Sequence, residues 1–177
     1  YEGSPGLWHS LLWVLTRLHV SFAGMHWVAG TIAVAGVFVL LRWSPFPLVL
    51  RVLFPFGFWL AYQDAVVARS YILFAVLAFP AAAILRVGMG KGLTKKRVLW
   101  LAVLLGLMAN LSVHGFVASL GFAAVGWTLL RRQRQRGAWV RATAATVLLG
   151  CFWAVAVATT IPPSDVNFAA GTNFDKS

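Results

Sequence analysis

The chain has 177 residues, of which 60% are hydrophobic and 11% are charged, and its mean hydropathy is +0.82. A soluble domain has about 45–50% apolar and about 25% charged residues, so this composition excludes an ordinary soluble domain and indicates an integral membrane protein. The formal net charge of +11 is also typical of nucleic-acid-binding proteins. However, the sequence has no RNA-binding motif of aromatic and basic residues, and we expect no nucleic-acid partner.

The first segment, residues 1–22, is predicted to lie on the outer membrane surface. Its apolar side chains recur at helical spacing, which is typical of an amphipathic helix in the membrane interface. A seventh membrane span over the same residues is the alternative. The chain begins Tyr-Glu-Gly without an initiator Met, so we expect it to be a piece of a longer protein. The polar face of the predicted helix consists of His9, Ser10, Thr16 and Arg17.

Six membrane spans are predicted between residues 25 and 161, in one all-α transmembrane domain. A helix that crosses a hydrocarbon core of about 30 Å needs about 20 apolar residues. Residues 98–130 are too many for one span at about 1.5 Å per residue, and the polar stretch "NLSVHG" at 110–115 divides them into two. Pro55 and Gly57 are expected to bend the second span. The spans are 25–42, 46–66, 69–86, the two halves of 98–130, and 139–161, followed by an outer loop at 162–177.

The basic residues predict how these spans are oriented. Twelve of the fifteen lie between spans one and two, three and four, and five and six. The positive-inside rule makes these loops cytoplasmic, so both ends of the chain lie outside. The acids were not used in this assignment, yet all four fall on the outer side, as do two histidines and an asparagine. Any site is therefore expected to face outward; the outer polar residues are Glu2, Asp64, Asp165, Asp175, His9, His114 and Asn110.

Arg69 and Asp64 lie where the second span leads into the third. An ionisable group at membrane depth costs roughly 2.5–3.5 kcal/mol on insertion scales, and less near the interface, where a long side chain can reach water. Arg69 is then either a boundary residue with Tyr71 as an aromatic anchor, or a cation in a cavity that binds an anionic group such as a phosphate. In the second case Asp64 either pairs with Arg69 or forms another polar part of the cavity wall.

The other reactive side chains predict no metal or nucleophile site by themselves. His114 is either a packed, hydrogen-bonded residue or a binding group. His9, His19 and His26 have spacings of ten and seven, which form no compact ligand set. A divalent metal held by Asp or Glu stays open. Cys151, the single cysteine, excludes an internal disulfide and a thiolate metal cluster. Phosphate-binding and nucleophile-elbow motifs do not occur.

Four segments, taken in order, resemble motifs of the GT-C superfamily of integral membrane glycosyltransferases. The segment "EGSPGLWHSLLW" resembles the stretch that opens a juxtamembrane helix after the first outer loop. "AVVARSYIL" resembles an arginine and tyrosine segment at the start of a span, and "LSVHGF" a histidine segment at the outer end of a span. The terminal "PPSDVNFAAGTNFD" resembles an outer loop of a bacterial, mostly uncharacterised branch. The sequence departs from the family in having Ser4-Pro5-Gly6 for His-Pro-Pro, and in having no acid directly before Arg69.

The resemblance implies a bacterial inner-membrane enzyme that moves a sugar from a polyprenyl-phosphate donor to an acceptor on the outer face. It also implies that the main catalytic acid precedes residue 1. Within this chain Glu2 and Asp64 are the catalytic candidates. The expected partners are the lipid-linked sugar donor and membrane lipids, and the cofactor is unknown. The candidates for binding phosphate or sugar hydroxyls are Arg69, Tyr71, His114 and His9.

Two other functions fit the same sequence. A transporter or flippase of lipid-linked sugars would need polar residues at mid-membrane depth along a path, whereas the predicted spans are nearly free of charge at their centres. A non-catalytic membrane subunit would use Arg69 and His114 only as anchors or packing residues. An acidic pair in an outer loop upstream of residue 1 would favour the enzyme over both alternatives.

Overall fold

The computed structural model describes residues 6–57, 72–133 and 137–161, and the regular secondary structure of these residues is entirely helical. The prediction of an all-α fold is confirmed. A 3-10 turn, η1, covers Phe54–Phe56. The α-helices of the described residues are α1 Leu7–Arg17, α2 Phe22–Trp43, α3 Leu48–Leu53, α4 Ile72–Lys91, α5 Lys95–Ala109, α6 Val113–Arg132 and α7 Ala138–Thr160.

Four of these helices are long and apolar enough to cross a membrane, which makes the chain a multi-span helical membrane protein. They are α2, α6, α7 and the part of α4 from Leu73 to Lys91. Six spans were predicted, and the described residues show four candidates. The helix α5 has 15 residues, about 22 Å at 1.5 Å each, which is shorter than a core of about 30 Å. Similarly, α1 has 11 residues, about 17 Å, so it does not form a seventh span.

Side-chain caps explain where several helices begin. The hydroxyl of Ser21 accepts a hydrogen bond from the Gly24 amide at 3.2 Å, and that of Thr94 accepts one from the Arg97 amide at 3.4 Å. Each bond satisfies one of the amides that a helix start leaves unpaired. The cap at Thr94 lets α5 begin at Lys95, three residues before the apolar run that predicted its start at 98.

The second predicted span, 46–66, does not continue as one bent helix. The α-helix ends at Leu53, the 3-10 turn contains Pro55, and Gly57 has an extended backbone with φ −68° and ψ 151°. Proline removes an amide donor and clashes with the preceding turn, so the helix ends here where a bend was expected. Residues 58–66 of that predicted span lie outside the described residues.

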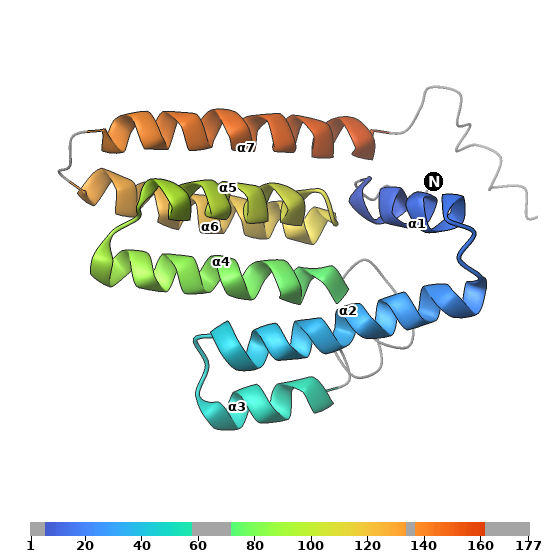
Figure 1. Ribbon diagram of the computed structural model, residues 1–177. Coiled ribbons are helices and arrows are strands. Elements are labelled where there is room, and N and C mark those ends of the chain that lie inside the picture. Colours follow the sequence, from blue (N-terminus) through green and yellow to red (C-terminus); the bar gives the residue numbers. More distant parts are fainter. Residues whose placement is uncertain (1–5, 58–71, 134–136, 162–177) are drawn as a thin grey trace, which may run out of the picture.

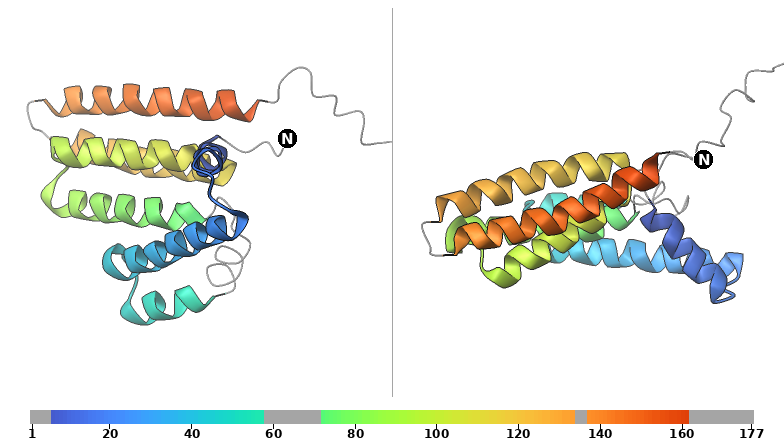
Figure 2. Two further views of the ribbon diagram at one scale, coloured as in Figure 1. Left: turned by 45° about the vertical axis from the view of Figure 1, so that its right-hand side comes forward. Right: turned by 90° about the horizontal axis from the view of Figure 1, so that it is seen from above.

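The spanning helices lie side by side, and α5 is at their centre. Figure 1 shows α2, α4, α5 and α7 stacked in that order, and Figure 2 shows α6 beside α5 and α7 when the bundle is seen from above. Leu105 and Met108 of α5 are fully buried, with Leu85 of α4 and Leu149 of α7 in the same cluster. Only 17–22% of each candidate span is buried, because most of its apolar surface is left to face lipid.

The two ends of this bundle differ in charge. We call the end with the α2–α3, α4–α5 and α6–α7 connections the basic end (Figure 1, left). Every described basic residue except Arg17 lies at this end or within about two helical turns of it. This agrees with the prediction that the basic loops lie on one side of the membrane. All four acids of the chain lie outside the described residues. The residues of the basic end are Arg42, Arg51, Arg86, Lys91, Lys95, Lys96, Arg97, Arg131, Arg132 and Arg141.

Candidate functional site

The opposite end of the bundle, which we call the distal end, holds α1, the turn Asn110–Ser112 and the C-terminus of α7. The amide of Leu7 donates to the Asn110 carbonyl at 3.1 Å, and the amide of Gly6 donates to Thr159 Oγ1 at 3.3 Å. The start of α1 is thereby bonded to both α5 and α7, and Figure 2 shows α1 at this end of the bundle. Three segments far apart in the sequence meet here.

Asn110 holds this end together. Its side chain is 7% exposed, and its Nδ2 donates to the carbonyls of Gly106 at 2.9 Å and Phe152 at 3.0 Å. Its own carbonyl receives the Leu7 amide. One residue therefore connects α5 to α7 through its side chain and to α1 through its backbone. The sequence indicated only that Asn110 is polar and outward, whereas the structure gives it a positioning role.

Asn110→Leu is expected to lower the free energy of unfolding by about 1–2 kcal/mol. The substitution keeps the side chain's size and removes both of its hydrogen bonds, each of which contributes about 0.5–1.5 kcal/mol in proteins and less on average between membrane helices. The measurement is the thermal unfolding of the detergent-purified protein. Thr143→Val is the control, because the Thr143 hydroxyl donates to Trp139 within its own exposed helical turn. An equal loss in both variants would contradict the role of Asn110.

His114 lies at the second position of α6, directly after the polar turn. Ser112 caps this helix by accepting from the Gly115 amide at 3.0 Å. Gly115 packs so closely on the end of α5 that a Cβ at this position would lie 2.2 Å from the Met108 carbonyl oxygen. The cap and the close approach fix the first turn of α6, and His114 is exposed on it.

His9 lies in the first turn of α1 and is also exposed. The helix α1 has no buried residue. The chain turns after its C-terminus at His19, which has a φ of 55°, and the His19 amide donates a hydrogen bond to the Thr16 carbonyl at 3.0 Å. The predicted amphipathic segment thus forms a short helix separate from the spans. The structure brings His9 and His114 to the same end of the bundle, since the hydrogen bond between Leu7 and Asn110 joins α1 to the turn that directly precedes α6.

The other predicted site residues fall on parts of the chain that the structure does not describe. Glu2, Asp64, Arg69 and Tyr71 lie outside the described residues, and their roles stay predictions. Among the residues that are described, no three His, Cys, Asp or Glu side chains come together in a group that could hold a metal ion.

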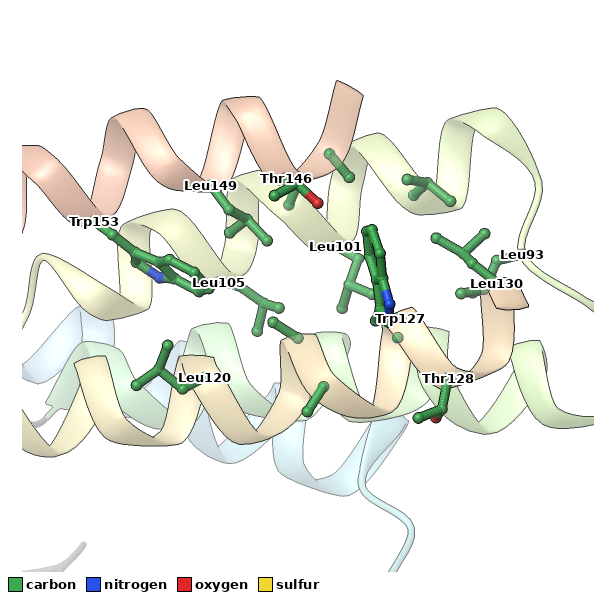
Figure 3. A pocket seen from close by; sticks show the side chains of 16 residues that line it. Leu93, Leu101, Leu105, Leu120, Trp127, Thr128, Leu130, Thr146, Leu149 and Trp153 are labelled. Carbon is green, nitrogen blue, oxygen red and sulfur yellow. The ribbon is translucent and has the colours of Figure 1, made fainter. Parts of the chain in front are cut away.

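An apolar groove runs between α6 and α7, with α5 as its floor. Its volume is about 460 Å³. Trp127 of α6 and Trp153 of α7 extend into it, as Figure 3 shows. Trp153 is held in place because its Nε1 donates to the fully buried Ser119 hydroxyl at 3.0 Å. The groove was not predicted from the sequence, because its walls are leucines, alanines and tryptophans like those of any other spanning helix.

Comparisons with models of protein families, with curated proteins and with solved structures find no match for this chain.

Proposed function

We propose that the protein is a glycosyltransferase of a bacterial inner membrane, which moves a sugar from a polyprenyl-phosphate donor to an acceptor on the outer face. The observation that carries the proposal is the order of the four segments that resemble GT-C motifs. Two of them contribute α1 and the first turn of α6, and the hydrogen bond from Leu7 to Asn110 joins α1 to the end of α5, at the turn that leads into α6. Their joining at one end supports the idea that the segments form one site.

The charge of the bundle supports an outward site. Loops rich in Lys and Arg are retained on the cytoplasmic side of membranes, so the basic end faces the cytosol in this proposal and the distal end faces outward. Polyprenyl-linked sugars used on the outer face would then reach His9 and His114 without crossing the bundle.

The shape of the bundle supports a lipid-linked donor. A polyprenyl chain is apolar and needs contact with apolar side chains within the membrane. The groove between α6 and α7 supplies such contact, because it is lined mostly by Leu and Ala with two tryptophans. Leu120, which is near its outer limit, lies seven residues from the start of α6, or about 10 Å below the distal end.

The proposed chemistry divides the roles among a few residues. A guanidinium suits a phosphate in a poorly hydrated place, and Arg69 has this role, with Tyr71, His9 and His114 as further donors to phosphate or sugar hydroxyls. A carboxylate within about 3 Å of the acceptor hydroxyl removes its proton. Glu2 and Asp64 are the candidates for this base in the present chain.

The experiment that tests the proposal measures sugar transfer in sealed membrane vesicles. Right-side-out vesicles that contain the full-length protein are given polyprenyl-phosphate donors with a radiolabelled sugar, and label in the acceptor fraction is counted. We expect transfer without any need to open the vesicles. Vesicles from cells that lack the protein are the control. Absence of transfer with every donor of a panel, from protein shown to be folded, would count against the enzyme.

A second measurement tests the orientation on which the site depends. With Cys151 replaced by serine, a cysteine at Arg132 and, separately, one at Leu18 are labelled with a maleimide that cannot cross membranes. Both positions are exposed, and they lie at the basic end and in the connection after α1. We expect Leu18→Cys to be labelled in intact cells and Arg132→Cys only after the membrane is opened. The reverse pattern would remove the proposed outer site.

A further inference from the structure

A second groove, distinct from the one between α6 and α7, runs along the lipid-facing side of α5 and α7. Its volume is about 320 Å³. Leu99 and Val140 on its walls are 56% and 72% exposed, so the groove opens toward the surrounding lipid. The residues that line it are Lys95, Val98, Leu99, Ala102, Val140, Arg141, Ala144, Ala145 and Leu148.

The groove occupies only the half of the membrane nearest the basic end. Along α7 it extends from Val140 to Leu148, which is about 12 Å at 1.5 Å per residue. The hydrocarbon core is about 30 Å thick, so this length fits within a single leaflet. A chain lying in the groove therefore belongs to a lipid whose headgroup is at the basic end, on the side away from His9 and His114.

Two positively charged side chains, Lys95 and Arg141, line this otherwise apolar groove. Lys95 is the first residue of α5, and Arg141 is the fourth residue of α7. The Arg141 Nη1 donates to the Leu93 carbonyl at 3.1 Å, which holds the guanidinium at the level of the α4–α5 connection. Both helices begin at the basic end, so the two charges are at the same membrane boundary.

The described residues at this boundary carry net positive charge, because none of them is Asp or Glu. The first turn of α5 adds to the excess, because it is Lys95, Lys96 and Arg97 with no acid. The N-terminus of a helix already carries partial positive charge. An anion at this boundary would be complementary to the side chains and to the helix dipole together.

We propose that the groove between α5 and α7 binds an anionic phospholipid of the leaflet at the basic end. One acyl chain lies along Val98, Ala102 and Ala144, and the headgroup phosphate lies between Lys95 and Arg141. The site is separate from the proposed sugar-transfer site and does not depend on that function. Zwitterionic lipids fit the apolar part equally well, so the two cations make the selection.

The test compares phosphatidylglycerol with phosphatidylcholine on the full-length protein purified in a non-ionic detergent. Native mass spectrometry gives the apparent affinity of each lipid. A cation at a membrane surface attracts an anionic lipid with about 1 kcal/mol, or roughly five-fold, so two cations predict a roughly 25-fold preference for phosphatidylglycerol. Lys95→Gln is expected to reduce this preference roughly five-fold. Equal binding of the two lipids by the unaltered protein would overturn the proposal.

Matched variants separate this site from general attraction to a basic surface. Lys96→Gln removes the same charge from the same helical turn, but Lys96 does not line the groove, so the preference should be unchanged. Ala144→Leu fills the groove and should abolish retention of both lipids there, whereas Ala154→Leu, an exposed position farther along α7, should not. The proposal fails if Lys96→Gln acts like Lys95→Gln, or if Ala144→Leu has no effect.

A final arm distinguishes a lipid from a soluble phosphate. Glycerol 3-phosphate has the headgroup charge without acyl chains, and it is expected to leave the thermal unfolding midpoint unchanged at concentrations where phosphatidylglycerol raises it. An equal rise with both compounds would mean that the site binds phosphate alone, and the assignment to a phospholipid would be wrong.

Discussion

Gly115→Ala is expected to destabilise the protein by about 3 kcal/mol or more, at the upper end of what overpacking usually causes. The added Cβ would lie 2.2 Å from the Met108 carbonyl oxygen. This neighbour is backbone and cannot rotate away, so α5 and α6 have to separate. Separation also disturbs the Ser112 cap, which bonds the amide of the same glycine. The measurement is the midpoint of thermal unfolding in detergent.

The matched control is Gly121→Ala, in the same helix. A Cβ at Gly121 meets nothing within 4 Å, and alanine is favoured over glycine in a helix by up to about 1 kcal/mol. This variant should unfold at the same temperature as the unaltered protein or slightly above it. If Gly115→Ala behaved like Gly121→Ala, the close approach of α5 and α6 at the distal end would be wrong.

Arg69→Ala is expected to lower sugar transfer by roughly a hundred-fold while membrane insertion stays intact. A charged hydrogen bond contributes about 1.5–3 kcal/mol, and a guanidinium binds a phosphate through two of them. A loss of about 3 kcal/mol corresponds to roughly a hundred-fold. The measurement is the initial rate of transfer from a polyprenyl-phosphate donor by equal amounts of the inserted full-length protein.

Arg17→Ala is the control for this loss. Arg17 is the other arginine predicted on the outer side, and it lies over the Trp13 ring at 5.1 Å on exposed α1. Removing it changes the net charge by the same amount, and transfer should fall by less than about two-fold, as for a screened surface charge. Unchanged transfer in Arg69→Ala, or an equal fall in both variants, would exclude Arg69 as the phosphate-binding residue.

Hydropathy predicted most of the helices because burial in lipid depends on composition more than on packing. The predicted spans 25–42 and 139–161 correspond to α2 and α7 within three residues at each end. The division of 98–130 at 110–115 is also confirmed, because α5 ends at Ala109 and α6 begins at Val113. A polar stretch inside a long apolar run was sufficient to predict that turn.

Hydropathy could not predict which apolar segments are long enough to span. The helix α3 ends at Leu53 because of local backbone chemistry at Pro55, and the limits of α5 depend on the Thr94 cap and on Asn110. These are effects of single residues, and an average over a window of about 19 residues hides them.

The sequence predicted the candidate site only as a group of polar residues on the outer side of the membrane. His9 and His114 were both expected at the outer side, and they lie at one end of the bundle. The bonds that bring them there could not be read from the sequence, because the Asn110 side chain finds its partners 4 and 42 residues away. Likewise, Ser119 and Trp153 pair across 34 residues, and neither has a local sequence signal for the other.

The turn between α5 and α6 also bears on how the chain enters the membrane during synthesis. Only three residues, Asn110 to Ser112, separate the two helices, and three residues reach at most about 10 Å. The end of α5 and the start of α6 must therefore stay at the same depth while the chain inserts. We expect the two helices to enter the lipid together, as a hairpin, because the 15 residues of α5 are too few to cross the core alone.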